Sequence, residues 1–530
     1  MSDQLQPVPL ITPGFKGLNT AQASVPDLDP GWAIVCQNFI FDVSGRLAAR
    51  NGWTQTTVTP IAGLPAIASQ GELALANGSV FVVSAANNKL YSGTTTLTDI
   101  TGSLTITGNN WQWLTFNGAI YGVQAGHPLI YWNGTGNFAI NAVTGGTAPT
   151  GGTCGLAAFG RLWVLDADNQ TIQYSALLDA TLWNGVSAGS INLATVWTKG
   201  IDQVIGIAAA GNLLVVFGTK QIILYADSAG SALGINPQNL YVKDTIEGTG
   251  LAARDTIQST GEGDLTFLSP TGVQSLQRLI TSGRDNPIAA LDMQIRDYFN
   301  GFFVNENISA VRSIYSPQNR FYVILLPATG RAFCYDTRQR LQDGGLRVTE
   351  WPGITWTSLL NQKSGAVLFG EKGVVGTYGG YSDNESAFTA IFASPNLALG
   401  GQGESNFENH TKILKRIKAV LFGGGASTVT FSWGVDFQGL PNTQQIVLNG
   451  GVAEYGTAEY GTNGKFNVNL AAPLTGVGYA EYSGSSGLII VGFPISNTGR
   501  WMQFGFTALI NGSQVAIQQL DAFVKIGNMS

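Results

Sequence analysis

Short apolar segments recur in pairs along the middle of the chain, and each pair has the pattern of a β-hairpin. The first segment is rich in β-branched and aromatic residues. A turn of Gly, Asn, Asp, Pro or Lys follows, and a second apolar segment completes the pair. The pairs occupy Val80–Gly93, Ala119–Gly134, Arg161–Ala176, Asn212–Asp227, Asp264–Leu279, Arg320–Asp336 and Gly365–Gly380. We therefore predict antiparallel strands over most of this region.

The spacing of these hairpins predicts a repeat. Successive hairpins begin 39 to 56 residues apart, and one blade of a β-propeller takes four antiparallel strands from roughly 40–50 residues. We interpret each hairpin as the two middle strands of a blade. The sequence thus predicts an all-β fold with a six- or seven-bladed β-propeller over residues 60–384. The alternative is a pair of β-sandwiches with irregular hairpins.

One segment has helical periodicity instead. In Asn286–Phe303 the apolar residues recur at spacings of three and four, Pro287 suits a first helical turn, and Asn300-Gly301 suits the helix end. The apolar face consists of Ile288, Leu291, Ile295, Phe299 and Phe302. We predict that this segment is the one short helix of the fold, lying in a loop against the side of the propeller.

The pattern changes after residue 384. Alternating apolar and polar residues predict strands there, at Phe388–Pro395, Thr411–Gly423, Ser427–Asp436, Arg500–Ile510 and Val515–Ile526. We predict a C-terminal, platform-like β-sandwich over residues 385–530. Residues 1–59 contain few regular strands, and we expect an extended N-terminal arm with a short strand that packs on the other domains.

Composition excludes several classes of protein. The chain is 44% hydrophobic and only 11% charged, with a net charge of −6, which argues against disorder, a coiled coil or a basic nucleic-acid binder. Gly is 69 of 530 residues, close to double its usual share, as expected for tight turns and crowded blade strands.

The cysteines and the N-terminus indicate a reducing compartment. Cys36, Cys154 and Cys334 are odd in number and far apart, so we expect buried thiols instead of a disulfide framework or a metal site. The N-terminal residues lack a basic region followed by an apolar stretch, so we expect no signal peptide. No apolar run is long enough to predict a membrane span.

Catalytic motifs are missing from the sequence. The two histidines, His127 and His410, have no metal-ligand partner nearby, and neither follows a G-x-S-x-G elbow. Asp166-x-Asp168-Asn169 lacks the Gly and Glu of a Ca²⁺ loop and suits a hairpin turn. We predict no enzyme activity, catalytic residue, cofactor or metal. Paired carboxylates for glycoside hydrolysis stay open, because the fold and not the sequence brings such groups together.

Two basic clusters and a tyrosine tandem are the candidate contact residues. The clusters are Lys412, Lys415, Arg416 and Lys418, and Arg331, Arg338, Arg340 and Arg347. We interpret both clusters as a solvated strand face or a subunit interface, with phosphate binding as the alternative. In the tandem Ala-Glu-Tyr-Gly repeat, Tyr455 and Tyr460 are candidate interface contacts or packing anchors.

The segment 14–53 resembles the opening of tail nozzle (tail-tube hub) proteins of short-tailed, podovirus-type bacteriophages. The shared elements are Gly-Leu-Asn near the start, Pro-Gly before Gln37-Asn38-Phe39, Gly45-Arg46-Leu47, and Arg50-x-Gly52-Trp53. The propeller rhythm, the helix near 286–303, the basic strand at 415–418, the Ala-Glu-Tyr tandem and the final strands from Arg500-Trp501-Met502-Gln503 are similar as well.

The resemblance implies a structural virion protein in the phage tail, assembled in the host cytoplasm. Family members form a homohexameric tube below the portal and its head-to-tail adaptor ring, line and gate the DNA ejection channel, and carry tail fibres or spikes. Genomic DNA passes through the lumen without sequence-specific binding. The family has no catalytic residue to carry over.

Two other functions stay open at this point. With 12 Trp and 16 Tyr, the chain has the aromatic surface of a carbohydrate-binding or carbohydrate-cleaving propeller, such as a receptor-binding or depolymerase component. An intracellular propeller scaffold is the third alternative.

Overall fold

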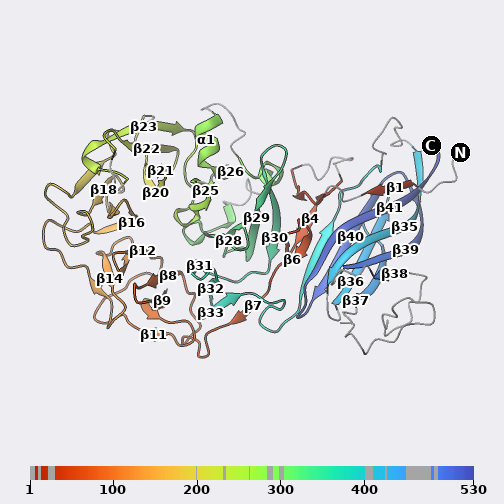
Figure 1. Cartoon of the computed structure of the whole chain (residues 1–530), viewed down its shortest axis with the longest axis horizontal. Coiled ribbons are helices and arrows are strands. Elements are labelled where there is room, and N and C mark those ends of the chain that lie inside the picture. Colours follow the sequence, from red (N-terminus) through yellow and green to blue (C-terminus); the bar gives the residue numbers. More distant parts are fainter. Residues whose placement is uncertain are drawn as a thin grey trace.

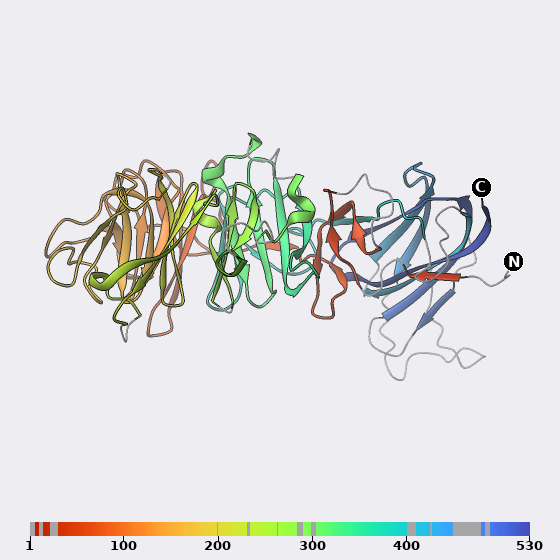
Figure 2. The same ribbon diagram turned by 90° about the horizontal axis from the view of Figure 1, so that it is seen from above.

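The chain folds into two bodies that lie side by side, a ring of small β-sheets and a β-sandwich (Figure 1). The computed structural model describes residues 6–9, 14–21, 30–198, 200–230, 234–261, 263–282, 290–297, 304–399, 410–423, 427–448, 479–482 and 488–529. Figure 2 shows the two bodies in one line, so the molecule is elongated. Several N-terminal strands lie between the two bodies, at their junction, whereas the first, Gln6–Pro9, lies on the sandwich.

Seven blades form the ring in the described part of the chain. Each blade is a small antiparallel sheet whose first strand lies at the centre of the ring. The first blade contains β8 (Ser69–Ala74), β9 (Val80–Ala86), β10 (Lys89–Ser92) and β11 (Thr98–Asp99), and the second contains β12 (Gln112–Phe116), β13 (Ala119–Val123), β14 (Ile130–Trp132) and β15 (Ala139–Ile140). The third contains β16 (Gly151–Ala158), β17 (Arg161–Asp166), β18 (Thr171–Tyr174) and β19 (Gly189–Asn192). The fourth contains β20 (Val204–Ala210), β21 (Leu213–Gly218), β22 (Gln221–Asp227) and β23 (Leu240–Glu247).

The remaining blades continue round the axis and return to the first. The fifth blade contains β24 (Gln258–Gly261), β25 (Asp264–Ser269) and β26 (Gly272–Ser275). The sixth contains β27 (Arg312–Ser316), β28 (Phe321–Leu326), β29 (Arg331–Arg340) and β30 (Leu346–Pro352). The seventh contains β31 (Ser358–Asn361), β32 (Val367–Glu371), β33 (Val374–Tyr378) and β7 (Trp53–Gln55). The inner strand β31 contacts β8, which closes the ring.

The predicted mainly-β propeller is confirmed. Each predicted hairpin is a pair of adjacent strands, from β9–β10 in the first blade to β32–β33 in the last. Apolar side chains fill the space between neighbouring blades; Phe217 of β21 and Phe267 of β25, for example, lie 4.9 Å apart across one such contact. Both faces of a blade carry apolar side chains, so a blade is stable only between two neighbours.

The seventh blade takes its outer strand from the N-terminal part of the chain. Gly376 of β33 pairs with Gln55 of β7, and Tyr378 pairs with Trp53. The last blade thus pairs with β7, a strand that precedes the first blade in the chain. This pairing closes the ring, because the first and last blades cannot separate without breaking backbone hydrogen bonds.

The predicted helical segment is helical at Arg296 and Asp297, but its described residues before Arg296 are not α-helical. Among the described residues with given bounds, the α-helix is α1 (Leu276–Ser282), which directly follows the fifth blade. Of the predicted segment, Ala290 forms an isolated β-bridge and Met293–Ile295 forms a 3-10 turn. Leu291 and Ile295 are nevertheless buried, as the apolar periodicity required. Ile288, Phe299 and Phe302 lie outside the described residues.

Two packed sheets form the sandwich. One contains β38 (Tyr479–Tyr482), β39 (Leu488–Gly499), β35 (His410–Gly423), β41 (Val515–Met529), β6 (Leu47–Ala49) and β5 (Phe39–Phe41), with β1 (Gln6–Pro9) paired to β41. The other contains β4 (Val35–Gln37), β34 (Phe388–Ala393), β40 (Met502–Ile510), β36 (Ser427–Val435) and β37 (Asn442–Leu448). On β36, buried Val429, Phe431 and Trp433 alternate with half-buried polar residues, as the sequence pattern predicted.

The two bodies share one sheet and one core. Strand β4 pairs with β30 of the sixth blade at Glu350 and with β34 of the sandwich, so the blade continues into a nine-stranded sheet of the described residues. The largest apolar cluster contains Tyr335 of the blade as well as Phe506 of the sandwich. A small parallel pair, β2 (Gly17–Leu18) and β3 (Trp32–Ala33), lies beside β30. The expected N-terminal arm is thus divided among several sheets.

Candidate functional site

The residues that carry the family resemblance lie at the junction of the two bodies. Arg50 is 1% exposed, and its Nη1 and Nη2 donate to the two carboxylate oxygens of Asp383 at 2.8 and 2.6 Å. Its Nε donates to Oδ1 of Asn38 at 2.9 Å, and its guanidinium lies 4.2 Å from the ring centre of Phe388. A bidentate pair of this kind fixes geometry as well as contributing free energy.

Asn38 links three parts of the molecule at this junction. Its Nδ2 donates to the carbonyl of Thr389 in the sandwich at 2.8 Å, and its backbone N–H donates to the carbonyl of Glu350 in the sixth blade at 2.7 Å. Its side chain also accepts the Nε–H of Arg50. The φ of Asn38 is 58°, a left-handed conformation that Asn tolerates better than most residues.

Gly52 of the same motif leaves no room for a side chain. A Cβ at this position would lie 2.0 Å from the carbonyl oxygen of Ser382. The backbone N–H of Gly52 donates to Gly380, and that of Trp53 donates to Ser382. The motif Arg50-x-Gly52-Trp53 therefore brings the N-terminal segment against the end of the last blade and against the start of the sandwich.

The second basic cluster of the sequence lies largely inside the sixth blade. Arg347 is 6% exposed and pairs with Asp336, and Arg331 pairs with Glu350. Arg338 donates to the carbonyl of Phe41. The interpretation of these residues as an exposed basic strand face is wrong. Carboxylates on the neighbouring strand form ion pairs with the guanidinium groups, and main-chain carbonyls accept their hydrogen bonds. Arg340, whose side chain is 49% exposed, is the exception.

A cavity of about 730 Å³ lies on the propeller axis and is lined by the inner strands of the blades. Small residues line it from several blades, among them Ser69, Gly155, Ala208 and Ser313. Trp113 also lines it, half-buried, and donates its Nε1–H to Oγ of Ser69 at 3.2 Å. This volume is within the range of small-molecule sites, roughly 300–1,000 Å³.

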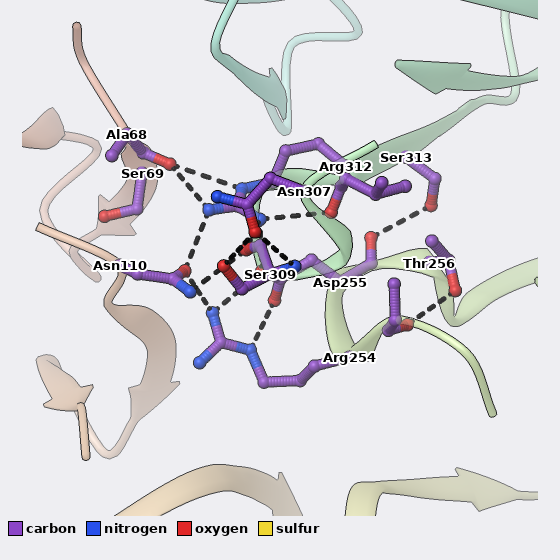
Figure 3. Close-up of polar contacts among 12 residues, drawn as sticks. Ala68, Ser69, Asn110, Arg254, Asp255, Thr256, Asn307, Ser309, Arg312 and Ser313 are labelled. Atoms are coloured by element: carbon purple, nitrogen blue, oxygen red, sulfur yellow. Dashed lines mark hydrogen bonds and ion pairs between the residues drawn. The ribbon is translucent and has the colours of Figure 1, made fainter. Parts of the chain in front are cut away.

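Two arginines and an aspartate form a network at the end of the axis where the inner strands begin (Figure 3). Arg254 donates to both carboxylate oxygens of Asp255 at 2.7 Å, and Nη1 of Arg312 lies 3.1 Å from Oδ2 of the same carboxylate. Both guanidinium groups donate to Oδ1 of Asn110 at 2.8 Å. We call Arg254, Asp255, Arg312 and Asn110 the axial network.

Main-chain contacts extend the axial network to further blades. Arg254 donates to the carbonyl of Thr153 at 2.7 Å, and Arg312 donates to the carbonyl of Ala68 through Nε and Nη2. Burial opposes ionisation of Asp255, but the two positive charges outweigh this effect and hold the pKa of the carboxyl below its ordinary value. The network thus joins blades one, two, three, five and six.

The sequence did not predict the axial network. Arg254 and Asp255 are adjacent in the chain, Asn110 lies far upstream, and Arg312 lies beyond the α-helix. No spacing rule connects these positions, and only the closure of the ring brings them together. The sequence offered one signal, the scarcity of charged residues. An arginine in an apolar region of such a chain is expected to be buried only with a partner.

The first basic cluster lies on β35 of the sandwich and is divided between its two faces. Lys412 is fully buried and donates to the carbonyls of His410 and Arg500 at 3.2 and 3.0 Å. Arg416 is exposed, and Lys415 and Lys418 are half-buried. A role of Lys412 in a subunit interface would therefore be indirect. Tyr455 and Tyr460 lie outside the described residues.

The other candidates from the sequence have structural surroundings. Cys36, Cys154 and Cys334 are buried free thiols, and burial raises the pKa of Cys154 to about 12. Burial lowers the pKa of His127, which contacts the hydroxyl of Thr107 at 2.8 Å. Asp168 accepts hydrogen bonds from the backbone of Gln170 and Thr171, as in a hairpin turn.

The described residues contain no group of three His, Cys, Asp or Glu side chains with the geometry to hold a metal ion. None of the helices in this part of the chain is long and apolar enough to cross a membrane.

Comparison with known proteins finds similarity to propellers. No family model and no curated protein matches the chain. A streptogramin B lyase structure is similar over 62% of this chain and 97% of its own, with 11% identity and a TM-score of 0.38. The WD40 propeller domain of Doa1 is similar over 61% and 95%, with 10% identity and a TM-score of 0.37. The Neurospora crassa Pan2 WD40 domain is similar over 62% and 96%, with 9% identity and a TM-score of 0.38. These similarities concern the propeller fold alone.

Proposed function

We propose that this chain is a structural component of the tail nozzle of a short-tailed bacteriophage. The observation that carries the proposal is the position of the motif residues shared with that family. Asn38, Arg50 and Gly52 lie where the propeller meets the sandwich, and their contacts help to hold the two bodies together. A motif that specifies how two bodies are held together suits a protein whose function is its shape.

The rigid connection between the two bodies supports this proposal. A nine-stranded sheet and a shared apolar core run through the junction of the described residues. Inter-domain contacts within a chain are typically more polar than this, and relative motion is the default unless the interface is large and hydrophobic. An elongated block whose two bodies share a sheet and a core suits the wall of a tube, where each copy must keep its shape while DNA passes.

The closed propeller axis makes oligomerisation a requirement of the proposal. The axial network crosses one end of a cavity whose volume suits a small molecule and not a duplex. DNA would therefore have to pass between copies of the chain, in the lumen of a ring that is expected to be hexameric. The adaptor ring and the tail fibres or spikes would bind outside this lumen.

The exposed part of the basic strand is the proposed subunit contact. Arg416 and its neighbours Lys415 and Lys418 lie on β35, on an otherwise weakly charged molecule. Paired with carboxylates of a neighbouring copy, these residues would fix orientation and register more than affinity.

The test is the assembly state of the purified chain, alone and with the adaptor ring. Light scattering and negative-stain imaging are expected to reveal six-fold rings or tubes. The double variant Lys415→Glu with Arg416→Glu should impair assembly and leave the thermal unfolding of the monomer unchanged. The control is Lys89→Glu, at an exposed position of the first blade, which should assemble normally.

The outcomes separate the interface from the function. Normal particles from the double variant would contradict the placement of the subunit contact on β35. A strict monomer, with or without the adaptor ring, would contradict the nozzle proposal itself.

Sugar cleavage is not favoured by the groups that line the cavity. The carboxylates among its described lining residues are Asp255, at the start of the inner strands, and Glu72, near the end of β8. Asp255 is ion-paired with two arginines. Glycoside hydrolysis needs two carboxyl groups that face the same bond, and these two lie at opposite ends of the cavity.

A further inference from the structure

We propose that the axial cavity binds one sugar-sized, polyhydroxylated molecule and prefers a sugar acid to the neutral sugar. The proposal is independent of the nozzle function, because it concerns the inside of one propeller and not the contacts between copies. It rests on an unpartnered buried side chain, on the shape of the cavity and on the charge at its closed end.

Gln70 on β8 is the first observation. This residue lines the cavity and is 8% exposed. Its Oε1 accepts the hydroxyl of Ser358 from the seventh blade at 3.1 Å, but its Nε2 has no hydrogen-bond partner among the described residues. A buried donor without an acceptor is costly. An acceptor oxygen within the cavity would remove that cost.

Asn361 on β31 supplies the opposite group. Its Oδ1 is buried and unpartnered within the described part of the chain, and it lines the same cavity. Strands β8 and β31 are in contact, so the free donor and the free acceptor belong to neighbouring blades. A hydroxyl group both donates and accepts a hydrogen bond, so a molecule with several hydroxyl groups satisfies both side chains.

The other glutamines at the cavity are held in place by neighbouring strands. Gln112 accepts the backbone N–H of Gly155 at 2.8 Å, and Gln258 donates to the carbonyl of Ser313 at 3.2 Å. Each bond joins two adjacent blades, so these side chains hold the wall of the cavity. Gln70 also bonds to a neighbouring blade, but it differs from them because the unpartnered end of its amide is buried.

The closed end gives the cavity its charge preference. Two guanidinium groups face one carboxylate in the axial network, which leaves one positive charge in excess among these residues. Their N–H groups donate to Asp255, Asn110 and main-chain carbonyls. The arginines would therefore act on a ligand through their field and not by direct contact. In a poorly solvated cavity that field favours a single negative charge.

The opposite end is the entrance. Thr115 and Lys363 line the cavity there and are exposed, whereas Ala158 and Ala209 are small and half-buried. The backbone N–H of Lys363 donates to the carboxylate of Glu72 at 3.1 Å, which holds this rim between the seventh and first blades. A ligand of one or two sugar rings would enter at this rim and stop at the axial network.

The experiment measures binding of defined probes to the full chain. Calorimetry and ligand-observed NMR are carried out with D-glucuronate, D-glucose and hexanoate, which carries the charge without the hydroxyl groups. Saturable binding of glucuronate at about 1 mM or tighter, weaker binding of glucose and no binding of hexanoate are expected. Binding of neither sugar would overturn the proposal, and equal binding of both would overturn its charge preference.

Variants assign the binding to the cavity. Gln70→Leu should weaken glucuronate binding about fivefold or more, the effect of one lost hydrogen bond. The control Gln124→Leu alters a glutamine that is equally buried and also has an unpartnered Oε1 among the described residues, but lies outside the cavity lining. It should bind like the unaltered chain. Unchanged binding by Gln70→Leu would overturn the site.

A second variant keeps the test decisive if Gln70→Leu fails to fold. Gln70→Glu preserves the shape and adds a negative charge, so it should weaken glucuronate binding more than glucose binding. An equal effect on both sugars would contradict the proposed position of the ligand acid. Both variants should still assemble as the unaltered chain does, so failure of the nozzle proposal and failure of this one are distinguishable.

Discussion

The propeller and the sandwich are built from the chain in different ways. Most blades take their strands from one continuous segment, as blade one does from β8 to β11. The sandwich takes β5 and β6 from the N-terminal region and β35, β39 and β41 from the C-terminal region, and β6 pairs directly with β41. The first body is a series of local pairings, whereas the second depends on pairings across almost the whole chain.

Some of the buried charged residues lie where this difference matters. The chain has few charged residues, and several of its buried ion pairs lie where separate parts of the chain meet. Arg50 and Asp383 join the propeller to the sandwich, and the axial network joins the blades. Hydrophobic packing holds each sheet stack together, but it is weakly directional. Bidentate ion pairs select one arrangement of the joined parts.

The largest expected effect is at the junction. Arg50→Ala removes a buried guanidinium from Asp383, Asn38 and the Phe388 ring, and leaves the carboxylate without its partner. We expect a loss of about 3–5 kcal/mol in the free energy of unfolding. Calorimetry should also separate the single transition into two, one for each body.

The matching control is an ion pair within one blade. Lys89→Ala breaks the ion pair with Asp99. The side chain of Lys89 is 51% exposed and that of Asp99 is 40% exposed. Unfolding should change very little, because water and salt screen such a pair. A similar loss of stability in both variants would contradict the special role of the junction.

The axial network should give the next largest effect. Asp255→Asn keeps the shape of the side chain but leaves Arg254 and Arg312 as neighbouring buried charges. We expect a loss of about 3 kcal/mol in a denaturant titration, together with faster hydrogen exchange in the inner strands. If the propeller loses no stability, the blades are held by packing alone and the network has another role.

A third prediction concerns acid and the turn before the fourth blade. Asp202 is 6% exposed, and its carboxylate accepts the backbone N–H groups of Gln203, Thr219, Lys220 and Gln221. Burial raises the pKa of this carboxyl, but the hydrogen bonds of Thr219 and its neighbours outweigh that effect and lower it overall.

The sign of the pH dependence follows from the lowered pKa. The stabilisation is complete above the unfolded value, near pH 4, and is lost as pH falls through the lower folded value. Asp202→Asn should cost about 2 kcal/mol at pH 7 and flatten the acid side of the profile of melting temperature against pH. An equally steep acid loss in the variant would contradict this assignment.

The smallest effect tests the local pairing of a blade. Asn87 and Asn88 form the two-residue turn between β9 and β10, with φ of 50° and 53°. Asn88→Gly should stabilise the chain by about 0.5 kcal/mol, because Gly is favoured at this position of a type I′ turn. Asn88→Ala should destabilise it, and thermal unfolding of both variants checks the pair.

The hairpins were predictable because their signals are local. The run from Val80 to Gly93 contains both strands and the turn that joins them, so period-two alternation and turn residues were sufficient. The prediction of helix before Arg296 failed for the opposite reason. Leu291 and Ile295 do face a core, but the contacts of Val273 and Leu346 with Leu291 hold this segment as a bridge and a 3-10 turn.

The candidate site was less predictable than the fold. The motif around Asn38 and Arg50 was visible in the sequence, but its role at the junction was not, because Asp383 and Thr389 are more than 300 residues away. Lys412 shows the same limit. Its neighbours in the sequence are basic, yet its side chain is inside the sandwich and donates to the carbonyl of Arg500.

The sequence by itself determined the strand-rich hairpins and their repeat along the chain, because neighbouring residues decide these properties. Only the tertiary structure decided that β7 closes the last blade, that β4 joins a blade to the sandwich, and that Arg254, Asp255 and Arg312 meet on the axis. Such contacts join residues that are distant in the chain. Their formation depends on the closure of the whole ring and sandwich, and no local pattern records it.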